Sequence, residues 1–107
     1  LIYILFLVGF LPKLVVGQNF QEFRSEVNID KKCKIAEELS NKYSAIDLDS
    51  ARIVGEVLLS YSNKKVSKKG VYLAYYIIGE VFARTAREEE GLDLLLKAKD
   101  YYIAEQE

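Results

Sequence analysis

The polar residues of this chain that could carry chemistry are few, and their spacing does not bring them together. The sequence holds no histidine, the commonest general base at neutral pH and the commonest metal ligand. Glu88, Glu89 and Glu90 could suggest a carboxylate metal site, but successive helical residues point about 100° apart and cannot converge unaided on one ion. The three residues are better interpreted as the negatively charged start of a helix.

No other pattern typical of catalysis or cofactor binding occurs in the sequence. Without histidine, Ser/His/Asp and Cys/His sets are excluded, and there is no glycine-rich phosphate loop or paired-cysteine zinc spacing. Cys33 is the only cysteine, so no intrachain disulfide can form, and we expect it to be a small apolar filler on a helix face. We therefore expect no enzymatic activity, no metal and no cofactor.

Four lysines precede three tyrosines in a way that could form a basic and aromatic patch for single-stranded nucleic acid. The formal net charge of the whole chain is −1, so no global basic field supports such binding. A solvated lysine-rich loop is the simpler interpretation, and we expect no nucleic-acid partner. The residues concerned are Lys64, Lys65, Lys68, Lys69, Tyr72, Tyr75 and Tyr76.

The first seventeen residues have the pattern of a secretory signal peptide. An apolar run from Leu1 to Leu11 is followed by Pro12 and then by a small-residue site that ends at Gly17. The basic stretch that usually precedes such a run is absent, and we expect it to lie upstream of Leu1. The prediction is cleavage near Gly17 and export to the periplasm or another extracytoplasmic space. A buried N-terminal helix and an uncleaved membrane anchor are the alternatives.

The rest of the chain predicts an all-α fold of helices joined by short polar turns. We expect a leader segment over 18–30, partly helical between 19 and 27, and then helical repeats over 31–107. Asp30 is the expected N-cap of the next helix, and Asp47 or Asp49 that of the following one. The predicted helices cover residues 31–44, 48–61, 71–85 and 88–104, with a lysine-rich loop over 62–70.

The third of these helices carries two apolar stripes rather than one. A helix on a two-layer core needs only one stripe, so we expect this helix to be sandwiched between neighbours. One stripe consists of Tyr75, Ile78, Gly79 and Phe82, and the other of Ala74, Ile77 and Val81.

The segment from 72 to 105 resembles a tetratricopeptide repeat (TPR). Its signature positions are Tyr75, Ile78, Gly79, Phe82, Gly91, Leu95 and Ala98, with Ile103 where the family commonly has proline. A weaker copy lies about forty residues upstream, where Ala51 and Leu58 correspond to Gly91 and Ala98. In its first helix, Ile35 and Leu39 correspond to Tyr75 and Gly79, and Lys42 is a poor match for Phe82. The excess over the usual repeat of about 34 residues is expected in the lysine-rich loop.

The resemblance implies two antiparallel hairpins, about 31–62 and 70–105, stacked as a short right-handed solenoid that binds a protein or peptide. In the family, the inner face of each first helix lines a concave groove. Carried over to this chain, that face consists of Leu73, Tyr76, Glu80, Ala83 and Arg84, and in the upstream hairpin of Cys33, Ala36, Ser40 and Tyr43. The alternative for Glu80 and Arg84 is an ordinary surface pair four residues apart.

A signal peptide followed by degenerate repeats resembles the N-terminal sensory part of bacterial membrane-bound regulators, and that is the function we expect. Membrane attachment would then come only from the export signal or from a segment beyond Glu107. A free-standing exported scaffold and an unrelated small helical bundle are the alternatives. The apolar end of the last helix, at Tyr101, Tyr102 and Ile103, also raises the alternative of self-association.

Overall fold

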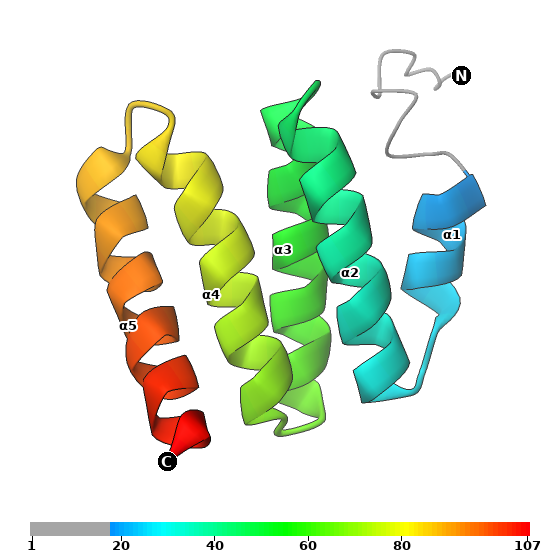
Figure 1. Ribbon diagram of the computed structural model, residues 1–107. Coiled ribbons are helices and arrows are strands. Elements are labelled where there is room, and N and C mark those ends of the chain that lie inside the picture. The colour runs from blue at the N-terminus through cyan, green and yellow to red at the C-terminus, as the bar shows by residue number, and fades with distance from the viewer. Residues whose placement is uncertain (1–17) are drawn as a thin grey trace.

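The computed structural model describes residues 18–107, and within that range the chain is all-α, as predicted. Figure 1 shows the helices following one another in a row. They are α1 (Gln18–Ser25), α2 (Ile29–Ser44), α3 (Leu48–Lys64), α4 (Lys68–Ala83) and α5 (Glu88–Gln106). No helix of the described part has the length and apolarity needed to cross a membrane. The predicted signal peptide over 1–17, with its cleavage site near Gly17, lies outside the described residues.

Three of the helix starts are fixed by side-chain caps. Asn28, and not Asp30 as predicted, caps α2, because its Oδ1 accepts a 3.0 Å hydrogen bond from the backbone nitrogen of Lys31. Asp47 caps α3 as one of the two predicted candidates, through the backbone nitrogen of Asp49 at 3.1 Å. Ser67 caps α4 by accepting from the backbone nitrogen of Gly70 at 3.1 Å.

The lysine-rich loop predicted over 62–70 is wrong in extent, because only residues 65–67 lie between α3 and α4. Lysine is a good helix former, so the polarity of this stretch reflects solvent exposure rather than irregular backbone. Lys69 lies in the first turn of α4, where its Nζ is 2.9 Å from Oδ1 of Asp30 on α2. Val66 adopts a positive φ of 55°, which allows the chain to reverse within three residues.

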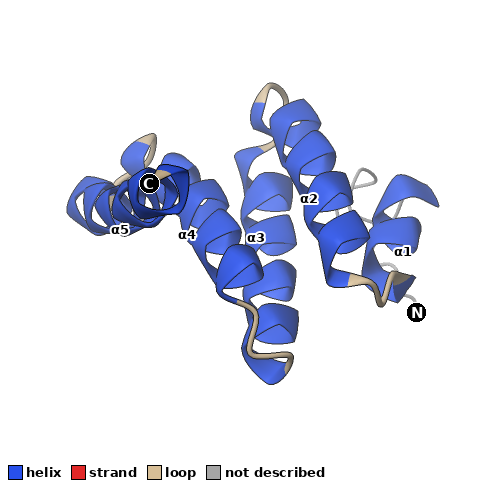
Figure 2. Ribbon diagram, turned by 60° about the horizontal axis from the view of Figure 1, so that its bottom comes forward, coloured by secondary structure: helices blue, strands red, loops and turns tan. Residues whose placement is uncertain are grey.

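Helix α4 lies between α3 and α5, as its two apolar stripes predicted (Figures 1 and 2). Glycines allow the helices to approach closely on both sides. A Cβ at Gly55 of α3 would lie 2.6 Å from Cγ1 of Ile78, and a Cβ at Gly91 of α5 would collide with the backbone of Ala83. Gly79 meets the backbone oxygen of Gly91 across the same contact. Small residues therefore set the spacing of all three helices.

The two hairpins, α2–α3 and α4–α5, repeat with an offset that changes from the first helix to the second. The first helices start at residues 29 and 68, an offset of 39, and the second helices start at 48 and 88, an offset of 40. The cause is the turn within each hairpin, which spans three residues at 45–47 and four at 84–87. Tyr43 therefore corresponds to Phe82, and Ser40 to Gly79, and all four are buried. The predicted pairing of Lys42 with Phe82 is thus wrong by one residue.

Helix α1 packs beside α2 and is joined to it through a buried lysine. Phe20 and Phe23 of α1 are both buried. Lys32 of α2 is only 1% exposed, and its ammonium lies 4.8 Å from the ring centre of Phe23 and 4.5 Å from that of Tyr61. The hydroxyl of Tyr61 donates a 2.6 Å hydrogen bond to the Val27 carbonyl oxygen, which ties the α1–α2 connection to α3.

Candidate functional site

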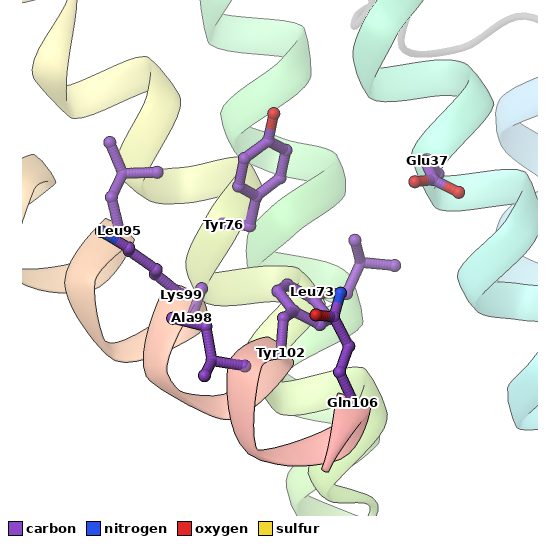
Figure 3. Close-up of a pocket in the computed structure, with 9 residues that line it drawn as sticks. Glu37, Leu73, Tyr76, Leu95, Ala98, Lys99, Tyr102 and Gln106 are labelled. Carbon is purple, nitrogen blue, oxygen red and sulfur yellow. The ribbon is translucent and has the colours of Figure 1, made fainter.

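A groove of about 600 Å³ opens where α4 and the C-terminal half of α5 face α2. Figure 3 shows that its side chains come from all three helices, so residues far apart in the sequence share one surface. Its lining is mainly apolar, with one acidic, one basic and one amide side chain. The lining residues are Glu37, Leu73, Tyr76, Leu95, Ala98, Lys99, Tyr102, Ile103 and Gln106.

Two of the five residues predicted for the second hairpin line this groove. Leu73 forms a buried part of its wall, and Tyr76 is 43% exposed above it. Glu80 is half-buried further along α4, outside the lining. Ala83 lies where α4 meets Gly91 of α5. Leu73 and Tyr76 therefore line the groove, whereas the other three predicted residues lie outside it.

Arg84 follows the end of α4 and contacts a different part of the surface. Its Nη2 donates to the backbone oxygen of Ser44 at 3.5 Å, next to the 45–47 turn. Together with residues 44–49 it lines a separate depression. The expected surface pair between Glu80 and Arg84 is not among the ion pairs of the described residues.

The inner face predicted for the upstream hairpin is wrong by one residue. Cys33, Ala36, Ser40 and Tyr43 are all buried in the core, with exposures of 5% or less. The offset of 39 between α2 and α4 instead makes Glu37 the counterpart of Tyr76, and Glu37 is exposed and lines the groove. The error has a physical cause, because the shorter 45–47 turn shifts the register of α2 relative to α3.

Helix α5 supplies most of the lining, and sequence reasoning did not assign those residues to a site. Leu95, Ala98, Lys99, Tyr102, Ile103 and Gln106 recur at helical spacing, so they form one stripe. The signal was present in the sequence, since Tyr102 and Ile103 were recognised as apolar residues at the end of the last helix. Tyr102 and Ile103 are 38% and 47% exposed.

The polar groups of the groove include a tyrosine hydroxyl and two side chains of opposite charge. Burial, reinforced by the Glu37 carboxylate, raises the pKa of Tyr102 to about 12, so its hydroxyl keeps its proton and can donate or accept a hydrogen bond. Lys99 and Glu37 carry opposite charges on opposite sides of the groove (Figure 3). A neighbouring depression includes Cys33, whose thiol pKa is raised by burial, so the thiol stays protonated.

The tyrosines and lysines of the alternative nucleic-acid patch are engaged separately. Tyr72 stacks on Tyr101 of α5 with ring centres 4.5 Å apart and planes 9° from parallel. Lys69 pairs with Asp30, and Lys65 lies 5.6 Å from the ring centre of Tyr61 on α3. The ring of Tyr72 therefore helps to hold α4 against α5.

One of the three acidic residues at the start of α5 takes part in a local ion pair. Glu90 accepts hydrogen bonds from Nε and Nη2 of Arg87 at 2.7 and 3.0 Å. Within the described residues, no group of three or more Cys, Asp or Glu side chains is arranged to hold a metal ion. Comparisons of the chain with protein-family models, curated proteins and solved structures find no match.

Proposed function

We propose that this chain is a protein-binding module of the TPR type, and that the groove between α2, α4 and α5 is its binding site. The observation that carries the proposal is the set of exposed apolar side chains in that groove, including Tyr76, Tyr102 and Ile103. Exposed apolar surface that gathers in a concave site is typical of a place where another molecule binds.

The repeated hairpins support the TPR assignment. Ser40 and Ala51 of the first hairpin correspond to Gly79 and Gly91 of the second, so small residues stand at both helix contacts. Three residues after Ser40 and Gly79, each hairpin has a large buried aromatic residue, which is Tyr43 in the first and Phe82 in the second. Only residues 65–67 separate the two hairpins, so the expectation that the lysine-rich loop holds the excess over about 34 residues is wrong.

Binding at this groove is passive and needs no chemical step. Tyr76 and Tyr102 supply large, rigid contact surfaces, and tyrosine is among the residues that dominate binding energy at interfaces. Glu37, Lys99 and Gln106 add charge and hydrogen bonding that fix the register of the ligand. Because the walls are packed helices, little conformational order has to be gained on binding.

A selection of displayed random peptides against the full chain tests the function. We expect the selected peptides to lose affinity by about tenfold or more with Tyr76→Ala or Tyr102→Ala. The matched control is Ile46→Ala, since Ile46 is 65% exposed but lies at the 45–47 turn away from the groove. Selected peptides that bind all three variants equally would show that the groove is not the binding site.

Export and a regulatory role are further parts of the proposal, and they rest on the sequence of residues 1–17 and on the family resemblance. A free-standing exported scaffold is the alternative. A fusion of the chain to a phosphatase that is active only outside the cytoplasm tests export. With a short basic stretch added before Leu1, phosphatase activity that disappears when Leu5 and Phe6 are replaced by lysine would support export. An inactive fusion of this kind made in normal amounts would refute it.

A further inference from the structure

Two tyrosines lie face to face between α4 and α5. The rings of Tyr72 on α4 and Tyr101 on α5 have centres 4.5 Å apart and planes 9° from parallel. Tyr75 meets the ring of Tyr72 edge-on, with centres 5.5 Å apart and planes at 89°. Tyr102 meets the ring of Tyr101 in a similar way, at 5.3 Å and 68°. Rings from two helices thus form one cluster, and its central pair is stacked.

The stacked pair borders solvent. Both rings are partly buried, and both line a depression of about 390 Å³ between the start of α4 and the end of α5. The same depression is lined by two ammonium groups, those of Lys68 and Lys97, and by two carboxylates, those of Asp100 and Glu105. A small oxidant can therefore reach the phenol rings, and the carboxylates can accept protons from them.

Tyrosine is the residue type of this chain that a one-electron oxidant attacks most readily. The sequence has eight tyrosines and contains neither methionine nor tryptophan. Its one cysteine, Cys33, is buried, and burial raises the pKa of its thiol, so the reactive thiolate is scarce. Tyr102 is 38% exposed and touches Tyr101, so a radical formed there can pass to the stacked pair.

Stacking is the geometry that favours coupling of two tyrosyl radicals. The new bond joins ring carbons next to the phenolic oxygens, and it forms between π orbitals that project at right angles to the ring planes. The parallel rings of Tyr72 and Tyr101 direct these orbitals at each other, whereas the edge-on rings do not. Because both reacting groups are held in this arrangement, coupling takes place within one molecule and needs no encounter between two.

We infer that Tyr72 and Tyr101 form a modification site, at which a peroxidase-type oxidant with hydrogen peroxide makes a dityrosine cross-link. Each phenol gives up one electron and one proton, and together these reduce hydrogen peroxide to two molecules of water. The two phenoxyl radicals then couple through one ring carbon each. Each of these carbons releases its proton and each phenolic oxygen takes one up, which restores both aromatic rings. The product is lighter than the unmodified chain by two hydrogen atoms.

The cross-link closes the open end of the α4–α5 hairpin. Tyr72 lies near the start of α4 and Tyr101 near the end of α5, opposite the turn at 84–87 (Figure 1). Leu73 and Tyr102, which directly follow the two linked residues in the sequence, both line the groove. The cross-link therefore fixes the separation of α4 and α5 at the groove wall, and its formation needs no ligand in the groove.

Treatment of the full chain with peroxidase and hydrogen peroxide, at low protein concentration, tests the inference. We expect a monomeric product that has dityrosine fluorescence and the mass loss of two hydrogen atoms. Trypsin releases Tyr72 within residues 70–84 and Tyr101 within the peptide that begins at Asp100, and tandem mass spectrometry of the linked peptides identifies the joined residues. Dityrosine that forms only between chains, or that joins other residues, overturns the inference. So does a reaction that couples free N-acetyltyrosine but leaves the chain without a cross-link.

Phenylalanine variants are the matched controls, because phenylalanine keeps the ring but has no phenolic proton to lose. Tyr72→Phe and Tyr101→Phe should each lower the yield of the monomeric product by about tenfold or more, since the stacked pair can then no longer couple. Tyr75→Phe, on the same helix and in edge contact with Tyr72, should leave the yield nearly unchanged. An undiminished yield from Tyr72→Phe contradicts the inference. The peptide map of the unmodified chain decides the matter if a substitution disturbs folding.

Discussion

The ammonium of Lys32 in α2 donates a 2.7 Å hydrogen bond to the backbone carbonyl oxygen of Phe23 in α1. The same Nζ also donates to the carbonyl oxygens of Arg24 at 3.1 Å and Glu26 at 3.0 Å. One buried side chain thus satisfies carbonyls at the C-terminal end of α1, where a helix leaves its last acceptors without intrahelical donors. Desolvation lowers the pKa of Lys32, and the three acceptors offset part of the cost of burying its charge.

Lys32→Met should therefore undock α1. The variant keeps the aliphatic length but removes three hydrogen bonds and leaves buried carbonyls unsatisfied, which costs about 2–3 kcal/mol. Urea unfolding gives the loss of stability, and amide hydrogen exchange should show faster exchange in α1 than in α4. Lys31→Met is the control, because that neighbouring side chain is exposed. Equal exchange in α1 of both variants would mean that Phe20 and Phe23 alone hold the helix.

Gly91→Ala should destabilise the protein although alanine is the better helix former. A Cβ at this position would meet backbone atoms of Ala83 and the carbonyl oxygen of Gly79, which cannot move aside as a flexible side chain does. Overpacking of this kind costs about 1–3 kcal/mol and exceeds the propensity gain of about 1 kcal/mol. The midpoint of urea unfolding is the measurement, with Ser60→Ala on the exposed face of α3 as the control. A higher midpoint for Gly91→Ala would show that α4 and α5 can separate at little cost.

Much of the fold could be predicted from local patterns, and the register of the site could not. The stripes of Tyr75, Ile78 and Phe82 and the Asp47 cap are short-range signals, and the helices they indicate are present. The one-residue difference between the 45–47 and 84–87 turns is not encoded in any stripe. Because of it, the counterpart of Tyr76 in α2 is the exposed Glu37 and not the buried Ala36. A sequence alone gives each helix its apolar face but not the alignment between two helices.

Long-range packing accounts for the other residues that sequence reasoning missed. Lys32 belongs to the residue types that are least often buried, and only the carbonyls at the end of α1 make its burial favourable. Tyr102 lines the same groove as Glu37, which precedes it by 65 residues in the sequence. Neither relationship has a local signal.

Ser62 and Ser50 offer a paired test of buried hydroxyl groups on α3. Both residues are fully buried, but among the described residues Ser62 Oγ has no hydrogen-bond partner, whereas Ser50 Oγ donates to Oδ2 of Asp47 at 2.8 Å. Ser62→Ala removes an unsatisfied group and should stabilise the protein by up to about 1 kcal/mol, while Ser50→Ala should destabilise it by a similar amount. Urea unfolding measures both. Equal destabilisation would indicate that Ser62 has a partner in solution.

Tyr102 should make the stability of the protein fall as the pH rises from about 10 to about 12. Its pKa is raised from the ordinary value of 10 to about 12, chiefly by burial and then by the Glu37 carboxylate. Between those two values the unfolded chain has released the phenolic proton and the folded chain still holds it, so each increase in pH favours unfolding. The stabilisation is fully present below pH 10 and is lost as the pH passes through the folded pKa.

The difference between the unmodified protein and Tyr102→Phe isolates this effect from the other tyrosines and from the lysines. Urea unfolding at a series of pH values from 8 upward should give a steeper decline for the unmodified chain, with parallel curves below pH 10. Glu37→Gln should make this decline smaller, because a neutral amide opposes the phenolate less than a carboxylate does and the folded pKa of Tyr102 then lies closer to the ordinary value. Curves that stay parallel throughout would place the Tyr102 hydroxyl in free contact with solvent, outside the groove wall.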